Sequence, residues 1–247
     1  MKVGIADYGM SVWDGGNFDP EQRWLALKQI GYDGIERIYA TSEADLVQQA
    51  ALMRRHGFAF TTVRGPDVRN GIAWTAAMGK DYVWVQVTAN DLPSFCRQAE
   101  IQAAACARYG IRAGLHNHLG SPVESQAQLE EFLACCPHCG LILDTGHLAA
   151  AGGDCAAIIR RYADRLLVVH VKDWFVTNPE IGLAQWYKRG RFCELGAGNI
   201  NLDHGPIIAA LRQAGYDGWV FVEHDTHLRE PLTDLTTSRQ YLRRAGC

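Results

Sequence analysis

Four short apolar stretches in the second half of the sequence each end in side chains that can bind a metal ion or transfer a proton. Each stretch has the length of a strand, and its apolar residues alone would fit an ordinary buried strand. Polar groups at the carboxyl ends of all four stretches predict one shared site. The stretches and their polar residues are 112–115 with His116 and His118, 141–143 with Asp144 and His147, 166–169 with His170 and Lys172, and 219–222 with Glu223.

We expect these side chains to converge, because a parallel α/β barrel places the carboxyl ends of its strands around one mouth. Mixed imidazole and carboxylate ligands suit Mn, Fe, Co, Zn or Mg ions that act as Lewis acids, with positions open for substrate. Asp144, His170 and Glu223 are the expected ligands from three strands. His116 and His118 share a face, because successive strand residues alternate, so either one can be the fourth ligand while the other transfers protons.

Strand-like and helix-like segments alternate along the whole sequence, which argues for parallel pairing, and eight such units can close into a barrel. A chain of 247 residues has a usual size for one such domain, and no linker divides it. The sequence therefore predicts a (β/α)8 TIM barrel as a single domain over residues 1–247. Besides the four stretches above, we expect strands at 2–6, 34–38, 58–63 and 82–88, and helices at 20–30, 42–56, 72–78, 91–109, 124–135, 154–162, 205–214 and 232–244.

Two segments need a separate interpretation. About thirty residues lie between Asp173 and Asp203, and connections of this length inside compact domains are usually functional, so we expect a substrate cover at the mouth. Cys136-Pro137-His138-Cys139 joins a predicted helix to the next strand, on the face opposite the mouth. Cys-x-x-Cys can be a redox pair or half of a zinc site. Because the sequence has no second Cys-x-x-Cys, we predict a turn here.

The composition describes an ordinary globular protein, with 48% hydrophobic and 21% charged residues. A net charge of −3 gives no electrostatic reason to expect nucleic acid or an anionic membrane as a partner. No apolar stretch approaches the roughly 20 residues that span a bilayer. Eight cysteines in a chain of this length do not make a disulfide scaffold, and no secretion signal is evident, so we expect a cytoplasmic protein.

Six motifs together resemble one family. The sequence is similar to the sugar phosphate isomerase/epimerase superfamily, the barrels related to xylose isomerase, over essentially the whole chain and in matching order. Within that superfamily it resembles the inosose dehydratases most. The motifs are Gly-Tyr-Asp-Gly-Ile-Glu at 31–36, Leu-His-Asn-His-Leu-Gly at 115–120, Leu-Asp-Thr-Gly-His at 143–147, His-Val-Lys-Asp at 170–173, Leu-Gly-Ala-Gly-Asn-Ile-Asn-Leu-Asp at 195–203 and Val-Glu-His-Asp at 222–225.

The resemblance implies a metal held by a residue at the end of strand five, an aspartate, a histidine and a glutamate. Carried over to this sequence, the ligands are His116, Asp144, His170 and Glu223. Many members have glutamate at the first position, and their 3-epimerases use two carboxylates on opposite faces of the substrate. The imidazole of His116 departs from that pattern. Inosose dehydratases have a His-x-His-x-Gly stretch here, as this sequence does at 116–120, so the resemblance favours elimination.

The activity that the resemblance implies is dehydration of an inosose or a related keto-sugar, a small cyclic polyol ketone, through an enolate stabilised by a divalent metal, with Mn or Co favoured. His118 or Glu223 would remove the α-proton, and His147 or Lys172 would assist loss of the β-hydroxyl. A homo-oligomer is also compatible with the resemblance. The candidate substrate contacts are Glu36, Trp13, Arg64 and Trp174.

Other activities compete with dehydration. A ketose isomerase or epimerase would use the same enolate and differ in the following step. A 3-keto-glycoside eliminase would expel a sugar substituent in place of hydroxide. An apurinic-site endonuclease shares the barrel but would need three metals and a basic DNA-binding face, which the charge balance does not supply. The last alternative is a metal-free barrel that serves as a binding module.

Overall fold

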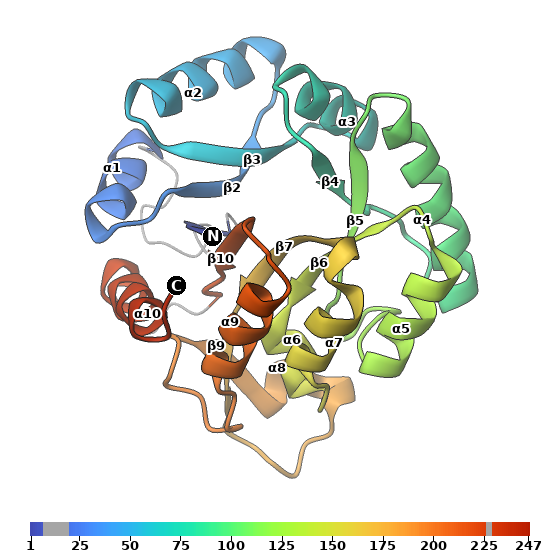
Figure 1. The fold of residues 1–247 in the computed structure, drawn as a ribbon, viewed down its shortest axis with the longest axis vertical. Helices are drawn as coiled ribbons and strands as arrows, with labels where there is room; N and C mark the ends of the chain where they lie inside the picture. Colours follow the sequence, from blue (N-terminus) through green and yellow to red (C-terminus); the bar gives the residue numbers. More distant parts are fainter. Residues whose placement is uncertain (7–19, 226–228) are drawn as a thin grey trace.

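A computed structural model describes residues 1–6, 20–225 and 229–247. Its centre is a parallel eight-stranded sheet in the order β3-β2-β1-β10-β7-β6-β5-β4. The sheet curves into a nearly closed barrel surrounded by helices (Figure 1), which confirms the predicted TIM barrel. The strands are β1 (Lys2–Ile5), β2 (Gly34–Tyr39), β3 (Ala59–Arg64), β4 (Tyr82–Trp84), β5 (Arg112–His116), β6 (Gly140–Asp144), β7 (Leu166–Val171) and β10 (Trp219–Val222).

The outer helices begin where the sequence provides caps. Ser42, Asp67, Asp91, Ser125 and Asp154 each accept a hydrogen bond from a backbone N–H in the first turn of the helix that follows. Observed and predicted ends therefore agree within two residues, except that the helix expected at 72–78 already begins at residue 68, after the Asp67 cap. The helices are α1 (Pro20–Ile30), α2 (Glu43–Arg55), α3 (Val68–Ala77), α4 (Leu92–Ala107), α5 (Gln126–Cys135), α7 (Cys155–Tyr162), α9 (His204–Gln213) and α10 (Pro231–Arg244).

Side-chain alternation divides the core into two layers. Tyr82, Ile142, Val168 and Phe221 form a small cluster, whereas the intervening strand residues Leu141, Leu143, Val169, Val171 and Val222 belong to the large cluster shared with the helices. Since strand side chains alternate between faces, the first set fills the barrel interior. The next inward positions along β6, β7 and β10 are those of Asp144, His170 and Glu223. The alternation of strand side chains thus places these polar groups next to the apolar residues that fill the barrel interior.

Strand β4 ends earlier than predicted. The expected strand covered 82–88, but the observed one stops at Trp84. The side chain of Gln102, on α4, accepts a hydrogen bond from Gln86 N at 2.8 Å and donates one to Trp84 O at 2.8 Å. An amide side chain therefore satisfies the backbone groups that a longer strand would have paired.

The long connection after β7 has regular structure of its own. It contains an antiparallel hairpin of β8 (Asp173–Val176) and β9 (Gly190–Cys193), with the short helix α8 (Trp186–Arg189) between the strands. The Asp173 carboxylate closes the base of this segment by accepting hydrogen bonds from Gly196 N and Gly198 N at 2.9 and 3.2 Å. A further short helix that the sequence did not predict, α6 (Thr145–Ala150), follows β6 directly.

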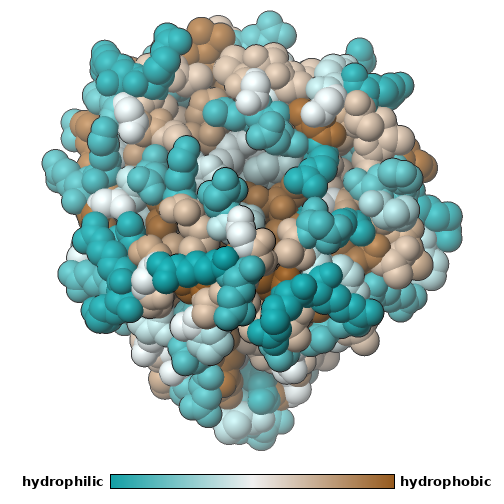
Figure 2. Space-filling model, viewed as in Figure 1, coloured by the Kyte–Doolittle hydropathy of each residue, from teal (hydrophilic) through white to brown (hydrophobic). Residues whose placement is uncertain are grey.

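Hydrophilic residues are scattered over the face of the molecule shown in Figure 2, and hydrophobic residues appear between them in small patches. Among the described residues, no helix is both long enough and apolar enough to cross a bilayer.

Candidate metal centre

Four side chains from four adjacent strands meet at the mouth of the barrel. His116, Asp144, His170 and Glu223 each offer one ligand atom, and these atoms all lie within 4.8 Å of one another. His116 Nε2 is 3.4 Å from Asp144 Oδ2 and 3.8 Å from Glu223 Oε2, and His170 Nδ1 is 2.6 Å from Glu223 Oε2. The group is the one predicted, and His116, not His118, supplies the imidazole from β5.

The two oxygens of Asp144 have different surroundings. Oδ1 accepts a hydrogen bond from His147 N at 2.8 Å and so caps α6, whereas Oδ2 has no hydrogen-bond partner although it is buried. The backbone of Asp144 is held by Asn117, whose amide group bonds both its N–H and its carbonyl at 2.9 and 3.0 Å. One oxygen is therefore occupied by the fold, while the other is presented to the centre.

Glu36 lies behind His170. Its carboxylate accepts hydrogen bonds from Tyr82 Oη at 2.9 Å and Trp84 Nε1 at 2.8 Å, and it lies 3.0 Å from His170 Nε2. Burial disfavours the charged ring of His170, but the carboxylates of Glu36 and Glu223 raise the pKa of His170 to about 10. In the absence of a cation, a proton on His170 therefore offsets part of the negative charge of the centre.

Lys172 brings one positive charge to three carboxylates. Its Nζ lies 2.6 Å from Asp225 Oδ2, 3.0 Å from Glu223 Oε1 and 3.5 Å from Asp144 Oδ2. Lys172 is fully buried, which opposes its charge, yet the three carboxylates raise its pKa above the usual lysine value. One ammonium cannot neutralise three carboxylates, so negative charge remains in excess here.

These donors fit a divalent cation. Buried polar atoms are normally hydrogen-bonded, but Asp144 Oδ2 and His116 Nε2 have no hydrogen-bond partner, and His170 Nε2 and Glu36 Oε2 have only each other, 3.0 Å apart. These atoms lie where negative charge is in excess. A bound cation would both coordinate the unsatisfied atoms and neutralise part of that charge. His116, Asp144, His170 and Glu223 would hold it, with nitrogen and oxygen donors that suit Mn, Co, Fe or Zn.

His118 lies beside the group and not in it. Its ring packs on that of His147, with 3.8 Å between centroids, and its Nδ1 donates a hydrogen bond to Leu119 O at 2.6 Å. Burial lowers the pKa of His118, and the nearby His116 adds to this effect. The ring is therefore neutral at neutral pH, with the proton on Nδ1, because a carbonyl oxygen only accepts. Its Nε2 remains free to accept a proton.

His147 is also neutral. Burial lowers its pKa well below the ordinary value, and the charge of Lys172 contributes. Its Nδ1 lies 3.3 Å from Leu119 N, and its Nε2 lies 3.2 Å from Lys172 Nζ. Of the two predicted proton donors, Lys172 therefore carries the charge and His147 contacts it.

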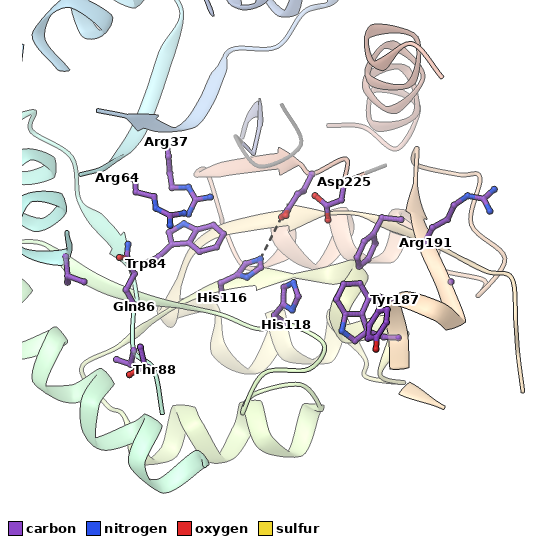
Figure 3. Close-up of a pocket in the computed structure, with 16 residues that line it drawn as sticks. Arg37, Arg64, Trp84, Gln86, Thr88, His116, His118, Tyr187, Arg191 and Asp225 are labelled. Atoms are coloured by element: carbon purple, nitrogen blue, oxygen red, sulfur yellow. Dashed lines mark ion pairs between the residues drawn. The ribbon is translucent and has the colours of Figure 1, made fainter. Parts of the chain in front are cut away.

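A cavity of about 840 Å³ opens onto the centre. Figure 3 shows Arg37, Arg64 and Trp84 on one side, His116 and His118 near the middle, and Asp225 and Tyr187 opposite the arginines. Trp186, Tyr187, Gly190, Arg191 and Phe192 of the long connection contribute to the lining, in agreement with its expected role as a cover.

The predicted substrate contacts are placed differently from one another. Arg64 lines the cavity. Glu36 and Trp174 are buried, with Trp174 packed on Phe192 and Trp186, and neither is among the residues that line the cavity. Trp13 lies outside the described residues.

Sequence reasoning missed three residues at the centre. Trp84 stacks on the His116 ring with 4.4 Å between centroids, and the Arg37 guanidinium lies 3.9 Å from the Trp84 ring centroid. Asp225 pairs with Lys172 and lines the cavity. Asp225 stands two residues after Glu223, and the alternation that singled out the glutamate could have indicated it as well.

The sequence matches the family described as "Xylose isomerase-like TIM barrel" over residues 24–245. This chain belongs to that family. Its curated relatives include inosose dehydratases of Lacticaseibacillus casei, 30% identical over 143 residues, and of Geobacillus kaustophilus, 31% identical over 152 residues. The matches cover 54% and 58% of this chain but only 47% and 49% of those proteins, so the chain spans about half the length of the curated relatives it matches.

Solved structures of this xylose isomerase-like fold superpose on nearly the whole chain. The probable 3-DHS dehydratase AsbF of Bacillus anthracis matches 98% of it with a TM-score of 0.75 and 14% identity, and covers 99% of its own chain. The IolI protein with a bound zinc atom matches 99% with a TM-score of 0.72 and 14% identity, and 98% of its own chain is covered. At these identities the likeness establishes the fold alone.

Proposed function

We propose that this protein is a divalent-metal-dependent lyase that removes water from an inosose or a related cyclic keto-polyol. One observation carries the proposal: His116, Asp144, His170 and Glu223 meet beside a cavity that His116, His118 and Glu223 line, and Asp144 Oδ2 and His116 Nε2 have no hydrogen-bond partner. The names of the curated relatives, inosose dehydratases, supply the substrate class. The excess of carboxylates favours a divalent cation in this role.

A bound divalent cation supplies Lewis-acid stabilisation of negative charge developing on a carbonyl oxygen. The residues of the chain perform the proton transfers. The free Nε2 of His118 takes the proton from the carbon next to the ketone, and the electron pair of that C–H bond becomes the new carbon–carbon double bond. Hydroxide leaves the neighbouring carbon and takes a proton that Asp225 relays from the Lys172 ammonium, so the products are water and an unsaturated ketone. Proton transfers of this kind accelerate the chemical step by about 10²–10⁴-fold.

The surroundings of Lys172 suit this second step. Asp225 lines the cavity and lies 2.6 Å from Lys172 Nζ, and His147 lies 3.2 Å from the same atom. The two contacts fix the buried ammonium behind Asp225, which lines the cavity, so Asp225 can relay a proton from Lys172 to the leaving hydroxide and return one from solvent after each turnover. Trp186 and Phe192 of the long connection flank the cavity and exclude water from the reacting carbons.

The decisive experiment incubates the metal-free protein, reloaded separately with Mn²⁺, Co²⁺, Zn²⁺ or Mg²⁺, with a panel of inososes, ketoses and 3-keto-glycosides. We expect loss of one water from an inosose, measured by mass spectrometry, with activity abolished by a chelator and restored by one of the metals. His118→Gln should abolish turnover and retain metal, and His56→Gln, a surface histidine paired with Glu21, is the matched control.

The panel also separates the alternatives. Conversion of a ketose without a change of mass would show that the protein is an isomerase or epimerase and not a lyase. One structural neighbour is named L-ribulose 3-epimerase; it is 17% identical, matches 99% of this chain and 94% of its own, and has a TM-score of 0.73. Release of a sugar from a 3-keto-glycoside would indicate an eliminase. Turnover that survives complete removal of metal would refute the proposal.

A further inference from the structure

A second group of potential metal ligands lies outside the barrel, between α4 and the turn that follows α5. Glu100, Cys136 and Cys139 each offer a donor atom, and the three atoms lie within 4.8 Å of one another. Both cysteines are buried, and the Glu100 side chain is 27% exposed. The turn predicted from Cys136-Pro137-His138-Cys139 is therefore present, but it faces a carboxylate that the local sequence could not reveal.

The backbone of the turn is held in place before any ligand binds. The Arg165 guanidinium donates hydrogen bonds to the carbonyls of Cys136, Cys139 and Leu133. On the other side, Glu100 Oε1 accepts a hydrogen bond from His138 N at 3.2 Å, and Glu100 Oε2 lies 2.7 Å from His138 Nδ1. Preorganisation of this kind reduces the ordering cost of binding an ion.

A third thiol, that of Cys96, lies beside this group but is not among the three donors that lie within 4.8 Å of one another. Cys96 lies one helical turn before Glu100 on α4, so the two side chains share a face of the helix. The Cys96 thiol contacts the Cys136 thiol, and burial, with this contact, raises the pKa of Cys96 to about 12. Cys136 Sγ lies 3.5 Å from the carbonyl oxygen of Cys96. Two thiols of a tight turn and one carboxylate of a helix thus converge, with a third thiol beside them.

Ordinary packing explains only part of this arrangement. Buried cysteines often serve as small apolar residues whose thiols donate to helix carbonyls, as Cys139 does toward Ala99 O at 3.7 Å. The contacts of Glu100 with His138 add a carboxylate to the two thiols of the Cys-x-x-Cys turn, which gives a donor set that packing alone does not require. The thiols are free, and Glu100 lines a hollow of about 580 Å³ together with Cys96 and Cys135.

We propose that Cys136, Cys139 and Glu100 bind a thiophilic divalent cation, Zn²⁺ being the best match. Thiolate donors select zinc over the harder ions, and Cys-x-x-Cys is a common half of four-coordinate zinc sites. The site is separate from the candidate metal centre, which contains no sulfur donor among the described residues. Binding releases protons from the thiols to solvent, because only thiolates coordinate.

The test loads the metal-free protein with Co²⁺, a spectroscopic substitute for zinc. Thiolate ligands give cobalt an intense charge-transfer absorption in the near ultraviolet, which nitrogen and oxygen ligands do not. We expect this band in the wild type, with two cobalt ions per chain. Cys136→Ala/Cys139→Ala should remove the band and one ion, and Asp144→Asn should remove the other ion and leave the band.

Two further variants keep the test decisive if the double variant fails to fold. Glu100→Gln changes a partly exposed side chain and should weaken the cobalt affinity of the thiol site by about tenfold or more. Cys135→Ser, an exposed neighbour, should leave the band unchanged. Absence of the band in fully reduced wild type, its persistence in the double variant, or its loss in Cys135→Ser would overturn the assignment.

Discussion

Replacement of Asp144 by asparagine separates the two roles of this side chain. Asparagine keeps an oxygen that can cap α6 in place of Oδ1, which accepts from His147 N at 2.8 Å, but it removes the charge from Oδ2, which has no hydrogen-bond partner. A unit charge about 4 Å away contributes about 4 kcal/mol at an effective dielectric constant of about 20, and a divalent cation doubles the attraction. Desolvation of the ion and the ligand offsets much of this gain.

We therefore expect Asp144→Asn to weaken metal binding at the mouth at least 100-fold, which corresponds to about 2.7 kcal/mol, and to abolish turnover. The metal-free variant should keep its melting temperature within about 2–4 °C of the wild type, the shift that 1 kcal/mol produces in a chain of this size. Asp144→Ala is the contrast, because it also loses the cap and should cost about 1 kcal/mol of stability.

The measurements are metal affinity by competition with a chromophoric chelator and thermal unfolding of the metal-free protein. Asp144→Asn that binds Mn²⁺, Co²⁺ or Zn²⁺ at the mouth as tightly as the wild type would refute the proposed ligand set. Collapse of the metal-free fold in Asp144→Asn would show instead that the charge of Oδ2 is structural.

Three other outcomes are expected. Arg64→Gln, at the cavity wall, should raise KM about tenfold and change kcat little in steady-state kinetics; an unchanged KM would exclude Arg64 as a substrate contact. Burial lowers the pKa of His204, so the unfolded chain binds more protons and the free energy of unfolding falls as the pH drops below about 6.5. In urea titrations between about pH 7 and 5, His204→Gln should lose less stability than the wild type. An equally steep loss in the variant would contradict this role of His204. A Cβ at Gly34 would lie 2.2 Å from Ala59 O, so Gly34→Ala should lower the free energy of unfolding in urea by about 1–3 kcal/mol. Gly182→Ala, with open space around the glycine, should leave it unchanged. Equal stabilities of the two variants would show that the backbone at Gly34 and Ala59 shifts to accommodate the methyl group.

The barrel and the four-residue group could be predicted because both depend on local periodicity. Asp144, His170 and Glu223 follow apolar strands of period two, and parallel strands bring their carboxyl ends together whatever the loops do. The choice of His116 over His118 could not be made in this way, because both share parity. It depends on the ring of His118 turning toward His147 and bonding Leu119 O.

Features that depend on contacts between distant segments were not predictable. The early end of β4 is set by Gln102 on the next helix. Helix α6 begins at Asp144 itself, so one residue serves as both candidate ligand and cap. The thiol site escaped sequence reasoning for the same reason, since Glu100 approaches Cys136 and Cys139 from a different helix. A single sequence does not indicate which side chains from different helices and strands contact one another.

The closed base of the β8–β9 hairpin has a consequence for how this barrel can change. Asp173 accepts from the backbone N–H groups of Trp174, Gly196 and Gly198, and a Cβ at Gly198 would lie 1.9 Å from its Oδ1. Both ends of the segment from Trp174 to Gly198 are thus hydrogen-bonded to the Asp173 carboxylate. Insertions or exchanges within this segment would reshape the cavity wall without displacing a strand, so selection can alter substrate choice here while the reactive groups below remain intact.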